Sequence, residues 1–124
     1  MEQRKILIVE DEVSLLKLES ILLTTRGYKV SAVTDGLKAL EEIKNDIPDL
    51  VLLDIMIPGI DGFEVCRRIK ADPETASLPV VMLTAKKSSA DQARGVEAGA
   101  DAYMTKPFKS GKIIEVVEEL LRKE

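Results

Sequence analysis

The chain of 124 residues is long enough to bury one hydrophobic core and too short for two ordinary domains. Apolar residues make up 45% of it and charged residues 32%, which excludes a disordered segment and favours a compact domain. The formal net charge is −4, and no run of Lys and Arg forms a basic patch, so we expect no nucleic-acid contact and no membrane binding. The first apolar run is too short for a signal peptide and no later run approaches a membrane span, so we expect a cytoplasmic protein.

Cysteine and histidine usage narrows the chemistry further. Cys66 is the single cysteine, which excludes a disulfide framework and a multi-cysteine metal site. It shares a helical face with Phe63, so we expect a buried core thiol rather than a nucleophile. The chain has no histidine, and so lacks the commonest general base and the commonest zinc ligand, and it cannot itself carry phosphohistidine.

Five short aliphatic or β-branched segments alternate with segments of helical periodicity. The expected strands are residues 5–9, 28–33, 50–54, 79–83 and 100–105. Alternating strands and helices imply βαβ crossovers and a parallel sheet, and nearly unbroken aliphatic strands imply that helices cover both of its faces. The sequence therefore predicts an α/β fold, a doubly wound (βα)5 domain, with no internal boundary.

The intervening helices carry apolar stripes and recognisable end signals. The stripes are Leu15, Leu18, Ile21 and Leu22; Leu37, Leu40 and Ile43; Phe63, Cys66 and Ile69; and Ile113, Val116, Val117, Leu120 and Leu121. The expected start signals are Asp35, Asp61 with Glu64, and Ser89 with Gln92, and the expected stops are Gly27 and Gly99. The last helix is expected over residues 110–122.

Ligands of doubly wound sheets bind outside the carboxyl ends of the strands, so the residues there are the candidates for a site. They are Glu10, Asp11 and Glu12, then Asp54, Thr84 and Lys106. Two carboxylates about 4 Å apart repel by roughly 4 kcal/mol at an effective dielectric near 20, so Asp11 beside Asp54 needs a cation. Carboxylates with a backbone carbonyl and water suit Mg²⁺, for which Mn²⁺ can substitute.

Asp54 is the unexpected charge, because it ends a strand of four apolar residues. We interpret it as a nucleophile that accepts a phosphoryl group as an acyl phosphate. Lys106 would supply a fixed positive charge and Thr84 a hydroxyl, and phosphoryl transfer depends on such positioning and charge compensation.

Each residue taken singly also has a structural interpretation. Glu10 and Glu12 could cap the following helix, Thr84 could be a loop hydroxyl, and Lys106 a solvated surface charge. Asp54 fits that pattern less well, since a Pro-Gly turn follows it and Asp61 already caps the next helix. The convergence of these residues at one edge favours a functional site.

Four segments, ILIVEDE, LVLLDIMIPGIDGFE, VVMLTA and DAYMTKPF, occur in an order that resembles the receiver domain of two-component response regulators. The resemblance covers nearly the whole chain and makes residues 1–124 one receiver domain. It implies a flavodoxin-like fold of strand order 2-1-3-4-5, and phosphorylation of Asp54 by a sensor histidine kinase or histidine phosphotransfer protein. It also implies Mg²⁺ held by Asp11, Asp54 and the Met56 carbonyl, with Glu10 assisting directly or through water.

The resemblance further implies how a signal leaves the site. Thr84 would move toward the phosphoryl group, Tyr103 would turn inward, and the surface of the fourth helix, fifth strand and fifth helix would change its preference for a downstream effector or output domain. The protein would be a phosphoacceptor rather than an enzyme, either a monomer or a phosphorylation-dependent dimer. The Lys106-Pro107 bond resembles the family's cis bond, and Met56 and Lys86 resemble positions that tune the acyl-phosphate lifetime.

Three other classes remain as alternatives. An aspartate-nucleophile phosphatase would need a second Asp two residues after Asp54, where this chain has Met56. A flavin or nucleotide carrier would need a Gly- and Ser-rich phosphate cradle after the first strand, where this chain has acids. The third alternative is a non-phosphorylated pseudo-receiver. We expect either a stand-alone receiver or one excised from a longer regulator, and favour the former.

Overall fold

The computed structural model describes residues 3–85, 88–106 and 109–122, and it contains the ten expected elements in the expected order. The strands are β1 (Lys5–Val9), β2 (Lys29–Val33), β3 (Leu50–Asp54), β4 (Val80–Thr84) and β5 (Ala102–Thr105). The helices are α1 (Val13–Thr24), α2 (Gly36–Asn45), α3 (Gly62–Ala71), α4 (Ser89–Ala98) and α5 (Ser110–Arg122). The expected ranges 28–33 and 100–105 began too early, by one and two residues, and the expected range 79–83 lies one residue before β4.

The five strands form one parallel sheet of order β2-β1-β3-β4-β5, as the flavodoxin-like prediction required. The three central strands are almost fully buried, and the edge strands β2 and β5 are partly exposed. This explains why β1, β3 and β4 are the most uniformly aliphatic segments of the chain. The order reverses between β1 and β3, so the sheet has its switch point beside the end of β3.

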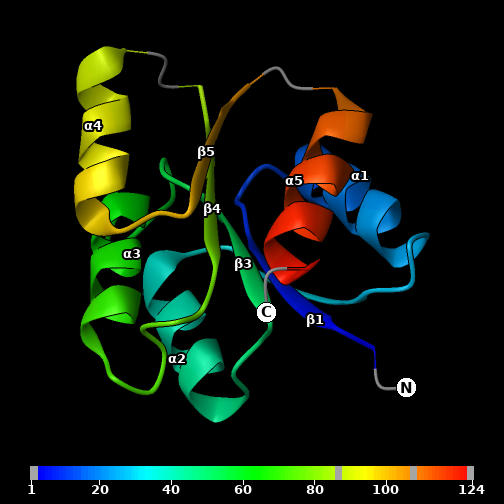
Figure 1. The fold of residues 1–124 in the computed structure, drawn as a ribbon, viewed down its shortest axis with the longest axis horizontal. Helices are drawn as coiled ribbons and strands as arrows, with labels where there is room; N and C mark the ends of the chain where they lie inside the picture. The colour runs from blue at the N-terminus through cyan, green and yellow to red at the C-terminus, as the bar shows by residue number, and fades with distance from the viewer. Residues whose placement is uncertain (1–2, 86–87, 107–108, 123–124) are drawn as a thin grey trace.

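Helices cover both faces of the sheet, with α1 and α5 on one side and α2, α3 and α4 on the other (Figure 1). Each side has its own core. Leu23 and Ile113 join the strand side chains of Ile6, Ile8 and Leu52 on the α1/α5 side. The opposite core includes Phe63 and Cys66, which is fully buried as expected for a core thiol, and burial raises the pKa of that thiol to about 11.

The helix ends follow the predicted signals except at the start of α4. Gly27 and Gly99 have φ values of 91° and 97°, and each closes its helix with paired backbone hydrogen bonds to the last turn. Asp35 and Asp61 cap α2 and α3, accepting from the backbone N–H of Lys38 and Glu64 at 2.8 and 3.0 Å. The Ser89 with Gln92 prediction for α4 was wrong.

Ser88 is the residue that caps α4. Its hydroxyl accepts from the backbone N–H of Asp91 at 3.1 Å and donates to the Asp91 carboxylate at 2.7 Å. Both adjacent serines can fill this role by chemistry, and only Ser88 has the extended backbone that a cap requires. The helix itself still begins at Ser89, within one residue of expectation.

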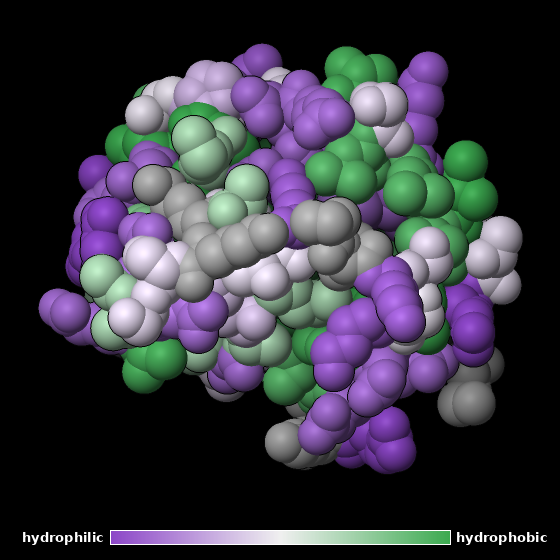
Figure 2. Space-filling view, turned by 90° about the horizontal axis from the view of Figure 1, so that it is seen from above, coloured by the Kyte–Doolittle hydropathy of each residue, from purple (hydrophilic) through white to green (hydrophobic). Residues whose placement is uncertain are grey.

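The apolar stripes of α3 and α5 are buried or half-buried as expected, but two other stripes were partly wrong. Leu18 and Ile21 of α1 are 45% and 62% exposed, and Leu37 of α2 is also exposed. The side of α1 that is turned inward carries Leu16, Leu23 and the fully buried Glu19. Val13, Leu18 and Ile21 all belong to α1, and hydrophobic side chains gather on the right of the view from above, the side on which Figure 1 shows α1 and α5 (Figure 2).

Among the helices in the described ranges, none combines the length and apolar character needed to cross a bilayer.

Candidate functional site

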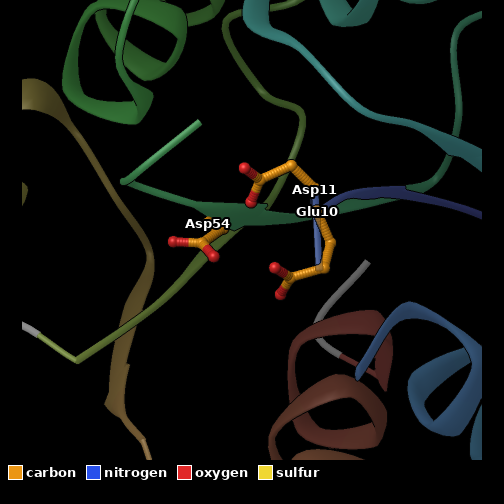
Figure 3. Close-up of side chains that lie close together, drawn as sticks. All are labelled: Glu10, Asp11 and Asp54. Atoms are coloured by element: carbon orange, nitrogen blue, oxygen red, sulfur yellow. The ribbon is translucent and has the colours of Figure 1, made fainter. Parts of the chain in front are cut away.

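The structure brings together the acids that follow β1 and β3. Val9 and Leu53 are partners in the sheet, so the residues after them meet at one edge. Glu10 and Asp11 leave the end of β1 on opposite sides, and Asp54 lies beside them (Figure 3). One carboxylate oxygen from each of the three acids lies within 4.8 Å of the others. We call these three residues the acid cluster.

The acid cluster is unevenly exposed. Glu10 and Asp54 are 1% and 5% exposed, whereas Asp11 is exposed at the rim. Burial is the main reason that the pKa of Glu10 rises to about 7, and its neighbour Asp54 raises it further. Two buried carboxylates this close are costly unless a cation or a proton compensates them.

Lys106 supplies one compensating charge. Its Nζ donates to Asp54 Oδ2 at 2.8 Å and to Glu10 Oε1 at 3.1 Å, across separations of 52 and 96 residues. Burial alone would lower the pKa of Lys106, but the hydrogen bond and charge of Asp54, followed by those of Glu10, raise it instead. Lys106 is therefore not the solvated surface lysine of the alternative interpretation.

The turn after β3 orients the other side of Asp54. The backbone N–H of Met56 donates to Asp54 Oδ1 at 2.9 Å, and the Met56 side chain points outward and is 59% exposed. Gly62 lets the start of α3 approach this turn, because a Cβ there would lie 2.7 Å from the Asp54 carbonyl oxygen. The Asp54 carboxylate is thus held at both oxygens.

The acid cluster fits a hard divalent cation. It offers oxygen atoms only, from carboxylates on two adjacent strands, and each carboxylate oxygen that accepts one hydrogen bond keeps a further lone pair. The acid cluster contains neither cysteine nor histidine, the ligands that would favour zinc. The donor set suits Mg²⁺, which proteins hold with one or two carboxylates while water completes its coordination.

The remaining predicted residues lie nearby on β4 and β5. Thr84 is fully buried at the end of β4, and its carbonyl accepts from the backbone N–H of Lys106 at 2.7 Å. Tyr103 is half-buried and packs against the core on the α2/α3/α4 side of the sheet. The predictions about Lys86 and the Lys106-Pro107 bond involve residues 86 and 107, which lie outside the described residues.

Helix capping does not account for the acids after β1. Glu12 occupies the N-cap position of α1, but its side chain makes no capping hydrogen bond. Glu10 Oε2 accepts from the backbone N–H of Glu12 at 3.3 Å, while its other oxygen is bonded to Lys106. The Glu10 side chain therefore belongs to the acid cluster.

One buried acid near the site was not predicted. Both carboxylate oxygens of Glu19 are without a hydrogen-bond partner among the residues that the structure describes. Burial raises the pKa of Glu19 to about 8, with the charge of Glu10 as the next cause. Its spacing of three residues from Leu16 and four from Leu23 was the available signal, since all three share one helical face.

Comparisons with known proteins show the family of the chain. The model of the response regulator receiver domain family matches residues 6–118. The DNA-binding response regulator MtrA of Mycolicibacterium paratuberculosis is 41% identical over 121 residues, which are 98% of this chain and 52% of MtrA. The chain thus spans about half the length of the curated relatives it matches.

Solved structures of similar chains have the same fold. A CheY-like receiver domain protein of Methanospirillum hungatei JF-1 is 28% identical, with a TM-score of 0.92 and coverage of 98% of this chain and 96% of its own. The receiver domain of a Pseudomonas aeruginosa PAO1 sensor histidine kinase, with magnesium in its active-site cleft, is 28% identical, with a TM-score of 0.89 and coverage of 97% and 98%. From its sequence match and its fold, the chain belongs to the response regulator receiver domain family of two-component systems.

Proposed function

We propose that Asp54 accepts a phosphoryl group from the phosphohistidine of a sensor histidine kinase or a histidine phosphotransfer protein. The observation that carries this proposal is the position of Asp54, with Lys106 at 2.8 Å and the carboxylates of Glu10 and Asp11 close beside it. A lone buried acid would not need this arrangement. An acceptor carboxylate that must meet a highly charged phosphoryl group does need it.

The transfer is a displacement at phosphorus. A carboxylate oxygen of Asp54 forms the new O–P bond while the P–N bond to the donor imidazole breaks, and the electron pair stays on the imidazole nitrogen. The ammonium group of Lys106 already contacts Asp54, so it is placed to bind an oxygen of the phosphoryl group that Asp54 accepts. The hydroxyl of Thr84, at the end of the adjacent strand, is the second donor in this proposal.

Asp11, Asp54 and Glu10 would hold Mg²⁺, together with the Met56 carbonyl, and Mn²⁺ would substitute for it. When bound, the ion supplies positive charge that neutralises the acid cluster and the phosphoryl oxygens. The oxygen-only donor set supports this assignment, as does the magnesium ion recorded in the similar Pseudomonas receiver domain. Glu10, which like Asp54 is buried, would ligate the ion directly or through one water.

The output of the domain would be a change of surface. Thr84 would move toward the phosphorylated Asp54, Tyr103 would follow, and the face formed by α4, β5 and α5 would change its affinity for an effector or output domain. The relatives of about twice this length are named as DNA-binding regulators, so a longer protein could use the switch to control DNA binding. The acidic composition of this domain favours protein contacts over DNA for the receiver itself.

The exposed apolar residues of α1 support a protein as the phosphodonor. Val13, Leu18 and Ile21 are all more than two-fifths exposed and lie within one arc of the helix that follows the acid cluster. Exposed apolar patches on soluble domains mark interaction surfaces.

We propose that residues 1–124 act as one cytoplasmic receiver domain, a phosphoacceptor rather than a turnover enzyme. Met56 occupies the position at which an aspartate-nucleophile phosphatase needs its general acid.

Intact-protein mass spectrometry tests the proposal. The native chain, incubated with acetyl phosphate or phosphoramidate and Mg²⁺, should gain the mass of one phosphoryl group and lose that gain when Mg²⁺ is withheld. Asp54→Asn should gain none, whereas the exposed cap variant Asp61→Asn should gain it normally. An unmodified native chain with every donor would contradict phosphoacceptor function and favour the pseudo-receiver.

A further inference from the structure

Gly95, in the middle of α4, lies directly against the ring of Tyr103. A Cβ built on Gly95 would lie 2.8 Å from Cδ2 and 3.2 Å from Cε2 of that ring, and 3.3 Å from the sulfur of Met82. Carbon atoms in favourable contact are about 3.5 to 4.0 Å apart, so a methyl group does not fit there. The missing side chain therefore forms a slot that the Tyr103 ring occupies.

The slot lies next to the proposed switch. Met82 is two residues before Thr84 on β4 and is the sheet partner of Tyr103. The ring is consequently enclosed by α4 on one side and by the strand that ends in Thr84 on the other. Its half-buried position also brings it near the charge of Asp91, one turn earlier on α4.

We propose that Gly95 is a positioning residue for Tyr103. Because Gly95 has no side chain, the Tyr103 ring can pack directly against the backbone of α4 in the position seen in this structure. A larger residue at position 95 would expel the ring and shift the balance between the two arrangements of the switch. This inference rests on the proposed function for its signalling meaning, since only a phosphorylated receiver would use the switch. The packing relation itself does not depend on phosphorylation.

Neighbouring contacts make the ring, rather than the helix, the part that yields. The guanidinium of Arg94 lies 4.1 Å from the centre of the Phe63 ring and ties α4 to α3. At the end of α4, a Cβ at Gly99 would lie 2.8 Å from Cγ of Lys70, so the helix terminus is closely packed as well. Rotation about the Tyr103 side-chain bonds is the less costly way to make room for a methyl group.

Tyrosine fluorescence can follow the ring directly. The chain has two tyrosines and no tryptophan, so Tyr28→Phe leaves Tyr103 as the single strong emitter. In this background, Gly95→Ala should raise the acrylamide quenching constant of Tyr103 about twofold, as a half-buried ring becomes exposed. The phenol pKa, which burial and then Asp91 now raise, should fall toward its ordinary value of 10.0 in an absorbance titration.

Gly111→Ala is the matched control. Gly111 is also helical, and no atom of a described residue lies within 4 Å of a Cβ built on it. It should leave quenching and the phenol pKa of Tyr103 unchanged. Unchanged quenching and pKa in Gly95→Ala would overturn the proposal, because the helix would then have absorbed the methyl group.

A second comparison covers the case in which Gly95→Ala fails to fold. Adding Tyr103→Ala to Gly95→Ala removes the ring, so folding and the urea midpoint of the Tyr103→Ala chain should be recovered. A double variant that stays unfolded would overturn the proposal. All these measurements are made without a phosphodonor or Mg²⁺, so their failure is distinguishable from a failure of Asp54 to accept a phosphoryl group.

Discussion

The Nζ of Lys106 lies 2.8 Å from Oδ2 of Asp54, and the same ammonium group reaches Glu10 at 3.1 Å. One cation thus bridges two buried carboxylates that come from the first and third strands. Lys106 is 96 positions from Glu10 and 52 positions from Asp54 in the chain. This bridge makes the site a compensated charge cluster, and its consequences for stability and ion binding can be measured.

Lys106→Met should destabilise the fold at neutral and higher pH. Removing one partner of a buried ion pair leaves the others uncompensated, and we expect a loss of about 1–3 kcal/mol at pH 8. The loss should be smaller at pH 5, because Glu10, whose pKa is raised to about 7, then keeps its proton and needs no counter-charge. Urea unfolding at both pH values checks this, with the exposed Lys112→Met as control. Equal losses at pH 5 and pH 8 would contradict the bridge.

Mg²⁺ should stabilise the native chain by relieving the acid cluster. A ligand that binds only the folded state at ten times its Kd adds about 1.4 kcal/mol. Asp11→Asn should remove most of this gain at little cost to the metal-free fold, since Asp11 is exposed. Thermal unfolding with and without Mg²⁺ measures both effects. A midpoint that Mg²⁺ does not move in the native chain would exclude the site.

The buried Glu19 should make the protein less stable as the pH rises. Its pKa is about 8 in the folded chain and its ordinary value is 4.5, so between these values the folded state holds a proton that the unfolded state has lost. The free energy of unfolding should therefore fall by about 1.4 kcal/mol per pH unit across that range on account of Glu19. Glu10 adds a fall of the same sign up to about pH 7.

Glu19→Gln should make the free energy of unfolding fall less steeply with pH. It removes one of the two protons, on Glu10 and Glu19, that the folded state holds and the unfolded state has lost. Chemical unfolding at pH 5 and pH 8 compares the native chain, Glu19→Gln and the exposed control Glu41→Gln. We expect the stability of Glu19→Gln relative to the native chain to increase with pH, and that of the control to stay constant. Parallel curves for all three proteins would show that Glu19 is ionised in both states.

Lys70 of α3 connects the loop before β4 with the loop before β5. Its Nζ donates to the carbonyl of Leu78 at 2.6 Å and to the Asp101 carboxylate at 2.9 Å, and that carboxylate also accepts from the backbone N–H of Val80. Lys70→Met should lower the free energy of unfolding by about 1–3 kcal/mol, because the Leu78 carbonyl loses this donor, although Asp101 keeps the N–H of Val80. Urea unfolding against Lys112→Met measures it. A loss no larger than that of the control would contradict the assignment.

The parallel sheet and the placement of the site residues were predictable because they depend on strong local signals, whereas the strand order was predicted only from the resemblance to receiver domains. Aliphatic segments identify the strands, and glycines that adopt a left-handed backbone conformation mark helix ends. The carboxyl ends of all parallel strands then lie at the same edge of the sheet. The positions of Glu10, Asp11, Asp54 and Lys106 followed from that edge alone. Their distances did not, since Lys106 is 96 residues from Glu10 and its side chain could equally have faced solvent.

The errors arose where the local pattern had more than one solution. Apolar residues lie on all sides of α1, so their spacing does not fix which side of the helix is buried, and the burial of Glu19 was not predicted. Ser88 and Ser89 both have cap chemistry, and only the backbone conformation separates them. The Gly95 slot was unpredictable because it depends on the contact of α4 with a ring on β5.

The most direct test of the central proposal is to locate the phosphoryl group on the chain. Borohydride reduces an aspartyl phosphate to homoserine, so the native chain treated with acetyl phosphate and Mg²⁺, then reduced and digested, marks its acceptor by peptide mass spectrometry. The proposal predicts homoserine at position 54 and at no other acid. Homoserine at another position, or none under conditions in which a known receiver domain is labelled, would contradict it.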